Sequence, residues 1–553
     1  MIQSDDLLHR KMYLWYKNSN TEFVLLFIFL SLAKILLVSD QSLYSYYGPH
    51  DDLLFLRHAD SLLQLNWLGE YNNLTLIKGI GYPLWVALSK LISVDLLLSQ
   101  HFLYIISCLV FVLVVRPLIY SKAVIFFLLF FLIFNPVSFT DSVGNRVIRD
   151  GIYPALSLLT FSLFLKILLS FLYEGRVKPI YSYLFGVLFS FFWITREEGL
   201  WVFPSLVFML VCCVFYIKPK IIRKELPGVI FRPFLIFISV NFLIASLNYS
   251  NYGVFEVVDI KSAPFLSAYG SLYRVKDGSS NNPVIDYETR LKIYSVSPSF
   301  ESLRTVLENK NKWWFQRKDD IQPGMFLWGL REAVKDKRYY ESAIMANDYY
   351  FNLADEVDEA CELGKLICRE KRETLLPMIS GETLKLLVPT IYNTLVYAIS
   401  FDGHSSDSSV YPLSMRDKAY FEEMTGERIA IKADAQSYKS KFMDVIAWVY
   451  SMLMLPGFVL SIIIISLSFF YSKQLRIIQI LSFSILLLVL TRVVLVSTID
   501  LTAFNAINML YLASAYPFLI AFTILNLGLA IDLIMNKNIF KRFSSERHSE
   551  RCD

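Results

Sequence analysis

Charged residues are scarce in this sequence. Only 18% of its 553 residues are Asp, Glu, Lys or Arg, whereas 55% are hydrophobic. A soluble chain of this length would need a more polar composition to cover its surface. The formal net charge is only +4, which gives no sign of a nucleic-acid partner. The apolar residues gather in long runs separated by short basic stretches, so the composition indicates a membrane protein.

Histidine and cysteine are also rare, with six residues of each. Their spacing matches no zinc site, so we expect no tightly bound transition metal. Two carboxylates, Asp51 and Asp52, could still hold a weakly bound Mg²⁺ or Mn²⁺ through their hard oxygen atoms. Cys361 and Cys368 could form a disulfide in an oxidising compartment, although a continuous helix would hold them apart.

The apolar runs predict about ten transmembrane helices, each long enough to cross about 30 Å of hydrocarbon. They lie at Phe23–Val38, His101–Val115, Ala123–Phe139, Ile152–Tyr173, Ile180–Ile194, Leu200–Ile217, Val229–Leu247, Met443–Tyr471, Leu475–Val496 and Ala503–Met535. The last run is long enough to tilt or bend. The sequence therefore predicts an all-α polytopic membrane protein.

Lysine and arginine recur in every second loop, beginning before the first run and ending after the last. Because basic loops stay in the cytoplasm, both termini are expected there. The other side then receives residues 39–100, two short loops and residues 248–442, whose amphipathic stretches predict a mostly helical extracytoplasmic domain. The expected parts are a transmembrane module (1–247), this domain (248–442), the last transmembrane helices (443–535) and a basic cytoplasmic tail (536–553).

The first outer loop, residues 39–100, carries polar residues close to a helix end. Asp51 and Asp52 follow the first helix, and a carboxylate at the membrane surface can act as a general base toward a hydroxyl. Lys78 comes before a Gly-Tyr-Pro turn and could bind a phosphate. The plain alternative is that an outer loop simply needs polar residues. Other residues of this loop expected at the same cavity are His50, His58 and Tyr82.

Two further outer loops carry charges at the mouths of helices. They contribute Arg146, Arg149 and Asp150 from GNRVIRDG, and Arg196, Glu197 and Glu198 from TREEG. Charges so close to a bilayer are costly unless they face a cavity, a polar ligand or one another. Arginine suits a phosphate because its planar fork donates two hydrogen bonds. We therefore expect one charged cavity that binds a phosphate, although internal pairing of arginines with carboxylates would also account for these residues.

This arrangement resembles the GT-C superfamily of membrane glycosyltransferases, over residues 23–247 and more faintly in the last helices. Its members have an acidic residue or pair in the first outer loop, matched here by Asp51 and Asp52, and a second acidic position that would fall on Asp150. The stretch KGIGYPLW from Lys78 looks like the Lys-Pro-Pro-type turn of protein O-mannosyltransferases and lipid A aminoarabinose transferases, with glycine replacing the first proline. The stretch NMLYLASAYPFL, residues 508–519, is similar to another GT-C helix but lacks its arginine. The first loop together with TREEG also looks like a group of poorly characterised bacterial membrane proteins.

The resemblance implies a bacterial cytoplasmic-membrane enzyme that takes a sugar from a polyprenyl-phosphate carrier on the outer face, with inversion at the anomeric carbon. The acceptor would be a glycan, a lipid or a protein, and membrane lipids would be the remaining partner. Aromatic residues of the outer domain could stack on sugars or form its core: Trp313, Trp314, Trp328, Tyr339 and Tyr340. The main alternative is a transporter or flippase of a lipid-linked glycan, which the lack of an inverted repeat argues against. A membrane scaffold is a third reading, against which the charged loops argue.

Overall fold

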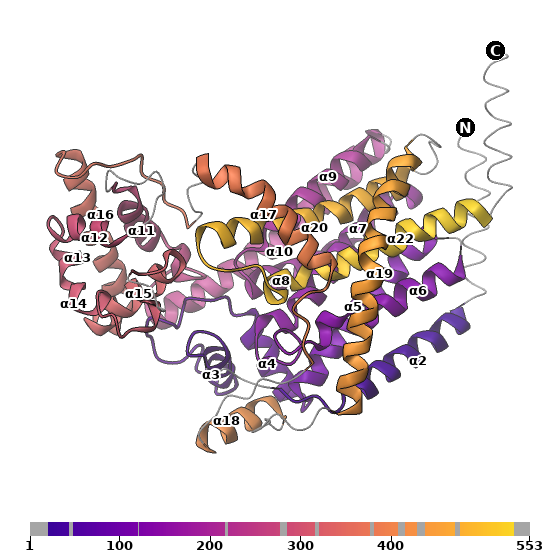
Figure 1. The fold of residues 1–553 in the computed structure, drawn as a ribbon, viewed down its shortest axis with the longest axis horizontal. Helices are drawn as coiled ribbons and strands as arrows, with labels where there is room; N and C mark the ends of the chain where they lie inside the picture. The colour runs from indigo at the N-terminus through magenta and orange to yellow at the C-terminus, as the bar shows by residue number, and fades with distance from the viewer. Residues whose placement is uncertain are drawn as a thin grey trace, which may run out of the picture.

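The computed structural model describes residues 20–43, 48–119, 121–215, 219–276, 285–315, 320–375, 381–406, 415–427, 437–469 and 476–535. Within these ranges the chain is helical and has no β-strand, only an isolated bridge between Val275 and Cys368. Long helices form a bundle, and a group of shorter helices lies at one end of it (Figure 1). The predicted basic tail, 536–553, lies outside the described residues.

The bundle contains the long apolar helices. They are α2 (Asn20–Val38), α5 (Leu96–Val115), α6 (Lys122–Ile133), α7 (Tyr153–Leu169), α8 (Pro179–Thr195), α9 (Phe203–Val214), α10 (Pro219–Tyr252), α19 (Tyr438–Ser468), α20 (Arg476–Thr502) and α22 (Tyr516–Met535). In the described part of the chain, eight helical stretches are long and apolar enough to cross a membrane, while α8 and α9 are apolar but shorter. The prediction of an all-α membrane protein is confirmed at this level, and the count of about ten spans stays a prediction.

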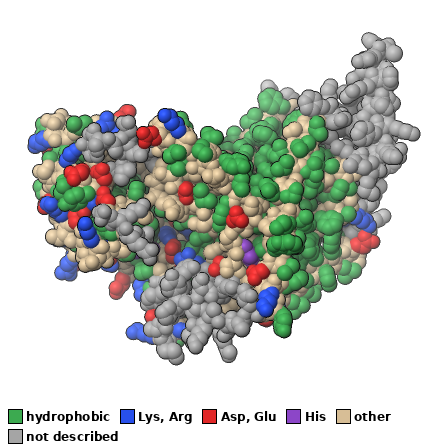
Figure 2. Space-filling view, viewed as in Figure 1, with side chains coloured by type: hydrophobic (Ala, Val, Ile, Leu, Met, Phe, Trp, Pro, Cys, Tyr) green, Lys and Arg blue, Asp and Glu red, His purple; other side chains and the backbone are tan. Residues whose placement is uncertain are grey.

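The surface of the bundle is apolar (Figure 2). Helices α7 and α22 are enclosed by their neighbours, whereas α2, α10 and α19 expose large hydrophobic side chains such as Phe29, Phe242 and Trp448. A soluble protein rarely exposes apolar patches of this extent. The exposed surface is therefore the one that a lipid bilayer would cover.

Contacts between helix ends agree with the alternation of basic loops. Nζ of Lys122 at the start of α6 lies 2.6 Å from a carboxylate oxygen of Glu22 at the start of α2. The guanidinium of Arg116, after α5, lies 4.8 Å from the ring centre of Phe23. The backbone N–H of Val177, before α8, donates to Glu225 of α10 over 3.4 Å. Loops predicted to share one side therefore lie near one another, while the side itself stays a prediction.

The predicted last helix, Ala503–Met535, is broken in the structure. After α20 the chain turns, forms the short α21 (Met509–Leu512) and the 3₁₀ turn η10 (Ala513–Ala515), and only then enters α22. The carboxylate of Asp500 accepts hydrogen bonds from the backbone N–H groups of Ala506 and Ile507 over 2.7 and 3.1 Å. The side chain of Asn508 caps α21. These polar residues hold a turn that an uninterrupted apolar run does not reveal.

A compact helical unit, residues 259–375, follows α10. Its helices are α11 (Ala263–Arg274), α12 (Tyr287–Tyr294), α13 (Pro298–Ser302), α14 (Arg304–Leu307), α15 (Pro323–Asp336) and α16 (Ala343–Glu362). They surround a core of their own, with Trp314 fully buried among residues such as Phe300 and Leu330. A disulfide joins Cys361 to Cys368. It forms because α16 ends at Glu362 and the chain reverses at Gly364, whose φ of +70° favours glycine.

Four shorter helices pack on the bundle or on one another: α3 (Asp52–Leu63), α4 (Gly81–Leu91), α17 (Gly381–Ile399) and α18 (Met415–Thr425). Helix α18 packs on α3 and α4, and α17 packs along α20, where Ser497 donates to Thr394 over 2.8 Å. The core of the expected domain 248–442 therefore ends near Leu366. Short turns connect these elements: η1 (Arg116–Leu118), η2 (Pro136–Phe139), η3 (Arg149–Gly151), η4 (Ser170–Glu174), η5 (Gly199–Val202), η6 (Asp259–Lys261), η7 (Trp313–Phe315) and η8 (Tyr339–Glu341).

Candidate functional site

A cavity of about 780 Å³ opens between the bundle and the helical unit. One wall is formed by the loop before α3, the loop from α6 to α7 and the loop from α8 to η5. The opposite wall comes from α11, η7, α15 and residues 370–375, and the α20–α21 turn closes one side. The predicted site residues that line it are His50, Asp51, Lys78, Arg146, Arg149, Asp150, Arg196 and Glu198. Loops about 50 to 100 residues apart therefore meet at one cavity.

Asp51 faces the cavity immediately before α3. Its carboxylate forms an ion pair with Nζ of Lys78, and its second oxygen lies 3.6 Å from Nη2 of Arg146. The side chain of Asp51 remains 35% exposed. Burial by itself would raise the pKa of Asp51, but the positive charges of Lys78 and Arg146 hold that pKa well below its ordinary value. Asp51 is thus a carboxylate at neutral pH and is accessible from the cavity.

Asp52 shares Arg146 with Asp51 but is buried, whereas Asp51 is not. It is the first residue of α3, is fully buried, and accepts hydrogen bonds from Nε and Nη2 of Arg146 over 3.1 and 2.8 Å. Removing one partner of a buried ion pair leaves the other charge uncompensated. Asp52 therefore lies behind the cavity wall and holds Arg146, which lines the cavity together with Asp51.

Arg149 and Glu197 connect the second and third loops. Nη1 of Arg149 lies 2.6 Å from Oε2 of Glu197, whose Oε1 accepts a hydrogen bond from the backbone N–H of Gly79 over 2.7 Å. A Cβ at Gly79 would collide with the carbonyl oxygen of Ile194. Glycine after Lys78 is therefore required for this close approach. Glu197 does not line the cavity, but it orients a residue that does.

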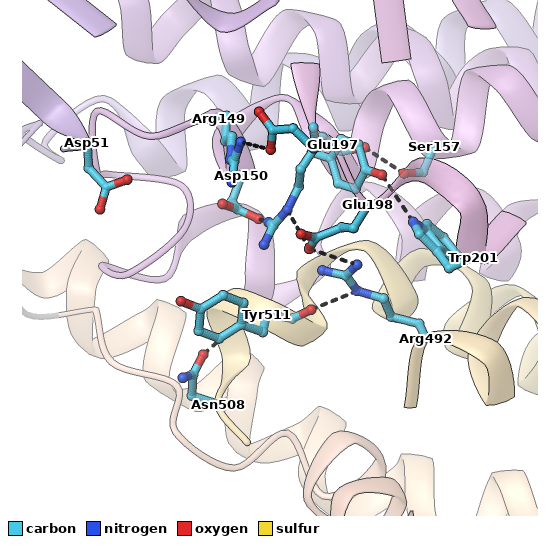
Figure 3. A network of polar contacts seen from close by, with 12 residues as sticks. Asp51, Arg149, Asp150, Ser157, Glu197, Glu198, Trp201, Arg492, Asn508 and Tyr511 are labelled. Carbon is cyan, nitrogen blue, oxygen red and sulfur yellow. Dashed lines mark hydrogen bonds and ion pairs between the residues drawn. The ribbon is translucent and has the colours of Figure 1, made fainter. Parts of the chain in front are cut away.

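Arg492 and Glu198 extend the network toward the last helices (Figure 3). Arg196 forms an ion pair with Asp150, and its Nε lies 2.8 Å from Oε1 of Glu198. Nη1 of Arg492 on α20 lies 3.3 Å from the same oxygen, and its Nε donates to the backbone carbonyl of Tyr511 over 2.8 Å. The two arginines lower the pKa of the Glu198 carboxyl to about 2 despite its burial. The cluster therefore ties these loops to the α20–α21 turn.

The cluster is electrically balanced. Its basic groups and carboxylates number five each: Lys78, Arg146, Arg149, Arg196 and Arg492 against Asp51, Asp52, Asp150, Glu197 and Glu198. The basic groups and the carboxylates therefore do pair with one another, as the alternative interpretation of the sequence predicted. This pairing does not exclude anion binding, because an arginine has five N–H donors, more than one carboxylate takes up. The four basic groups of the cluster that line the cavity, Lys78, Arg146, Arg149 and Arg196, can therefore still donate hydrogen bonds to a phosphate.

Arg492 and Tyr511 were not singled out from the sequence. Arg492 is 1% exposed, and Tyr511 lines the cavity. Arg492 is the only charged residue between Arg476 and Asp500, inside a predicted span. A lone arginine in such a run is costly unless it faces a polar interior, so this signal could have identified it.

Several predicted residues lie away from the cavity. His58 is buried on α3, where burial lowers the pKa of its imidazole to about 4. Tyr82 is fully buried and donates to Oε1 of Gln100 over 3.1 Å. Both side chains pack in the core under the first loop, because each falls on the inward face of a short amphipathic helix. They support the loop and do not border the cavity.

The predicted aromatic residues divide between the cavity and the core. Trp313 and Trp328 line the cavity and flank His50, with ring centres 5.2 and 4.7 Å from the imidazole. The helical unit therefore contacts the first loop at the residue next to Asp51. The remaining ones pack in or against the core of the helical unit: Trp314, Tyr339 and Tyr340.

Asp51 and Asp52 do not form a site that fits a divalent cation. Both side chains lie at ion-pair distance from Arg146, and Asp51 also pairs with Lys78. A cation bound there would have to displace both basic groups. Among the described residues no group of three His, Cys, Asp or Glu side chains could hold a metal ion.

Comparison with known proteins leaves the site to be interpreted on its own geometry. No protein-family model matches the chain, and no curated protein matches it either.

Proposed function

We propose that the protein is a membrane glycosyltransferase that moves a sugar from a polyprenyl-phosphate carrier to an acceptor on the far side of the membrane. The observation that carries this proposal is Asp51, a partly exposed carboxylate in a cavity next to two basic groups. A transferase of this kind needs a base for the acceptor and cations for the departing phosphate, and the cavity has both.

In the proposed reaction, an acceptor hydroxyl gives its proton to Asp51 as its oxygen forms a bond to the anomeric carbon. The bond between that carbon and the phosphate oxygen breaks, and its electron pair leaves with the phosphate. Lys78, Arg146, Arg149 and Arg196 are the candidates that stabilise the negative charge of the leaving phosphate. Attack from the face opposite to the phosphate inverts the anomeric carbon.

Lys78 would have two roles in this scheme. In the ligand-free protein it pairs with Asp51, and the low pKa of Asp51 makes that carboxylate a weak base. A donor phosphate would compete for the same ammonium group. As Lys78 and Arg146 shift toward the phosphate, the pKa of Asp51 rises and its carboxylate becomes a better proton acceptor. Donor binding would thus prepare the base.

The wall contributed by the helical unit is suited to the acceptor. Trp313, Trp328 and Tyr273 line it together with Arg274 and Arg372. Aromatic rings and arginines recognise sugars and anionic groups through flat faces and paired N–H donors. A glycan, a lipid or a protein acceptor could be held there, and membrane lipids would surround the bundle.

The test is transfer from a radiolabelled polyprenyl-phosphate sugar by purified protein in proteoliposomes, with the covalent product identified. We expect labelled product with the unaltered protein and almost none with Asp51→Asn. The matched control is Asp336→Asn, which removes a partly exposed carboxylate of the helical unit. Movement of the intact donor across the membrane without a new glycosidic bond would favour a transporter or flippase and would refute the proposal.

A further inference from the structure

Helix α15 of the helical unit packs on the first loop through one of its faces. Trp328, Arg331 and Glu332 are spaced by three and four residues, so their side chains lie on the same side of α15. Arg331 donates a hydrogen bond to the backbone carbonyl of Asn73, and Glu332 accepts one from the side-chain amide of Asn73 over 3.1 Å. Helix α15 is therefore fixed against the middle of the first loop, shortly before Lys78.

The same face of α15 reaches the start of the first loop, next to the proposed base. The ring centre of Trp328 lies 4.7 Å from that of His50 and 6.0 Å from Nζ of Lys78. Trp313, which precedes α15, also lies against the imidazole, with ring centres 5.2 Å apart. Trp328 therefore lies beside the chain neighbour of Asp51 and beside the ammonium group that pairs with Asp51.

The helix that follows Asp51 does not fix the direction of its side chain. Asp51 is the residue before α3, yet its carboxylate makes no capping hydrogen bond to that helix. Its backbone N–H donates to the carbonyl oxygen of Gly48 over 3.0 Å, and the turn closed in this way contains His50. The carboxylate is directed at Lys78 and the cavity instead. The direction of the Asp51 side chain therefore depends on what holds this turn and Lys78.

We call the packing of His50 between Trp313 and Trp328 the aromatic contact. We propose that the aromatic contact positions the proposed base relative to its ammonium partner, so that its three residues are positioning residues. Nδ1 of His50 is buried and has no hydrogen-bond partner in the described part of the chain, so ring contacts hold this side of the imidazole. An aromatic ring without nitrogen should therefore serve nearly as well. The inference rests on the proposed function for the role of Asp51 as the base.

The experiment compares His50→Ala, which removes the ring, with His50→Phe, which keeps a ring and removes both nitrogen atoms. In the proteoliposome transfer assay we expect kcat of His50→Ala to fall roughly 10- to 100-fold, because displacing a catalytic group by about 1 Å can cost about 10²-fold in rate. The affinity for polyprenyl phosphate should stay nearly unchanged, and His50→Phe should restore most of kcat. The matched control is Tyr339→Ala, which removes an aromatic contact with Tyr349 elsewhere in the helical unit.

Hydrogen–deuterium exchange gives a second measurement that needs no activity. The backbone amides of Asp51, Leu53 and Phe55 donate within this turn and the first turn of α3. They should exchange faster in His50→Ala and at the unaltered rate in His50→Phe and in the Tyr339 control. Trp328→Leu should also accelerate this exchange. The double variant should exchange no faster than His50→Ala alone, because both changes remove the same contact.

Unaltered exchange in His50→Ala would overturn the inference, as would additive effects in the double variant or a normal kcat in His50→Ala. A His50→Phe variant as slow in transfer as His50→Ala would overturn it too, because the imidazole would then act through its nitrogen atoms. If the unaltered protein transfers no sugar, the proposed function fails, whereas the exchange rates still decide whether the aromatic contact holds the turn at Asp51.

Discussion

Buried arginines occur in two regions of this protein with opposite surroundings. In the helical unit, Arg290 is enclosed by Glu308 and Asp320, and Arg331 pairs with Asp259, with neither arginine at the cavity. In the cluster beside the cavity, arginines with equally close carboxylates border open space. The same type of ion pair is therefore a structural contact where it is sealed and a candidate binding group where it faces a cavity. Burial and pairing alone do not separate the two.

The largest expected effect is on the transfer rate, and it distinguishes Asp51 from Asp52. Asp51→Asn should lower the transfer rate by roughly 10²–10⁴-fold, because the proton acceptor is lost while shape is kept. Its thermal unfolding should stay close to that of the unaltered protein. Asp52→Asn should instead lower the unfolding temperature, because Arg146 loses its closest carboxylate, which is fully buried. Equal destabilisation by both changes would show that Asp51 is structural as well.

Breaking the buried ion pair between Arg331 and Asp259 should lower the stability of the protein and leave ligand binding unchanged. Asp259→Ala leaves Arg331 buried without its carboxylate and should cost about 3–5 kcal/mol of unfolding free energy. Donor affinity at low temperature should not change. The control is Glu341→Ala, which breaks an exposed pair with Arg338 and should cost no more than about 1 kcal/mol. Denaturant unfolding and donor titration give the two readouts, and a loss of donor affinity in Asp259→Ala would contradict the comparison.

Replacing Lys78 should change ligand binding rather than stability. Lys78→Ala removes a charge-assisted contact to the donor phosphate, worth about 1.5–3 kcal/mol, and should weaken donor binding roughly 10- to 150-fold. The same change should raise the pKa of Asp51, whose nearest positive charge is gone. Isothermal titration with a polyprenyl phosphate gives the affinity, and the acidic limb of the pH–rate profile should move to higher pH. Unchanged affinity and an unchanged limb would remove Lys78 from the site.

The smallest expected effect is on the pH dependence of stability. It arises from Glu256, which lies between α10 and the helical unit. Burial, followed by the charge of Asp259, raises the pKa of Glu256 from its ordinary 4.5 to about 7. The folded protein therefore holds a proton that the unfolded chain releases, so this group favours folding below pH 4.5, and that contribution is lost as pH rises to about 7. Glu256→Gln should flatten the pH dependence of the unfolding temperature in this window and raise stability at pH 8. Parallel curves for the variant and the unaltered protein would contradict this.

The sequence by itself determined the helices and the chemical character of the site. Hydrocarbon about 30 Å thick requires long apolar runs, so nearly all the long helices follow from composition along the chain. Charged residues between such runs are costly, and for this reason the three loops stood out before their contacts were known. The lone Arg492 carried the same signal within a run.

Only the tertiary structure decided which of these residues border the cavity. Asp51 precedes α3 and Asp52 is its first residue, and packing selects which of the two side chains faces the cavity. The turn before α21 depends on side-chain contacts of Asp500 rather than on hydropathy. The position of α17 beside α20 likewise depends on contacts over about 100 residues of sequence. Local composition fixes what a segment can be, whereas long-range packing fixes which neighbour each side chain meets.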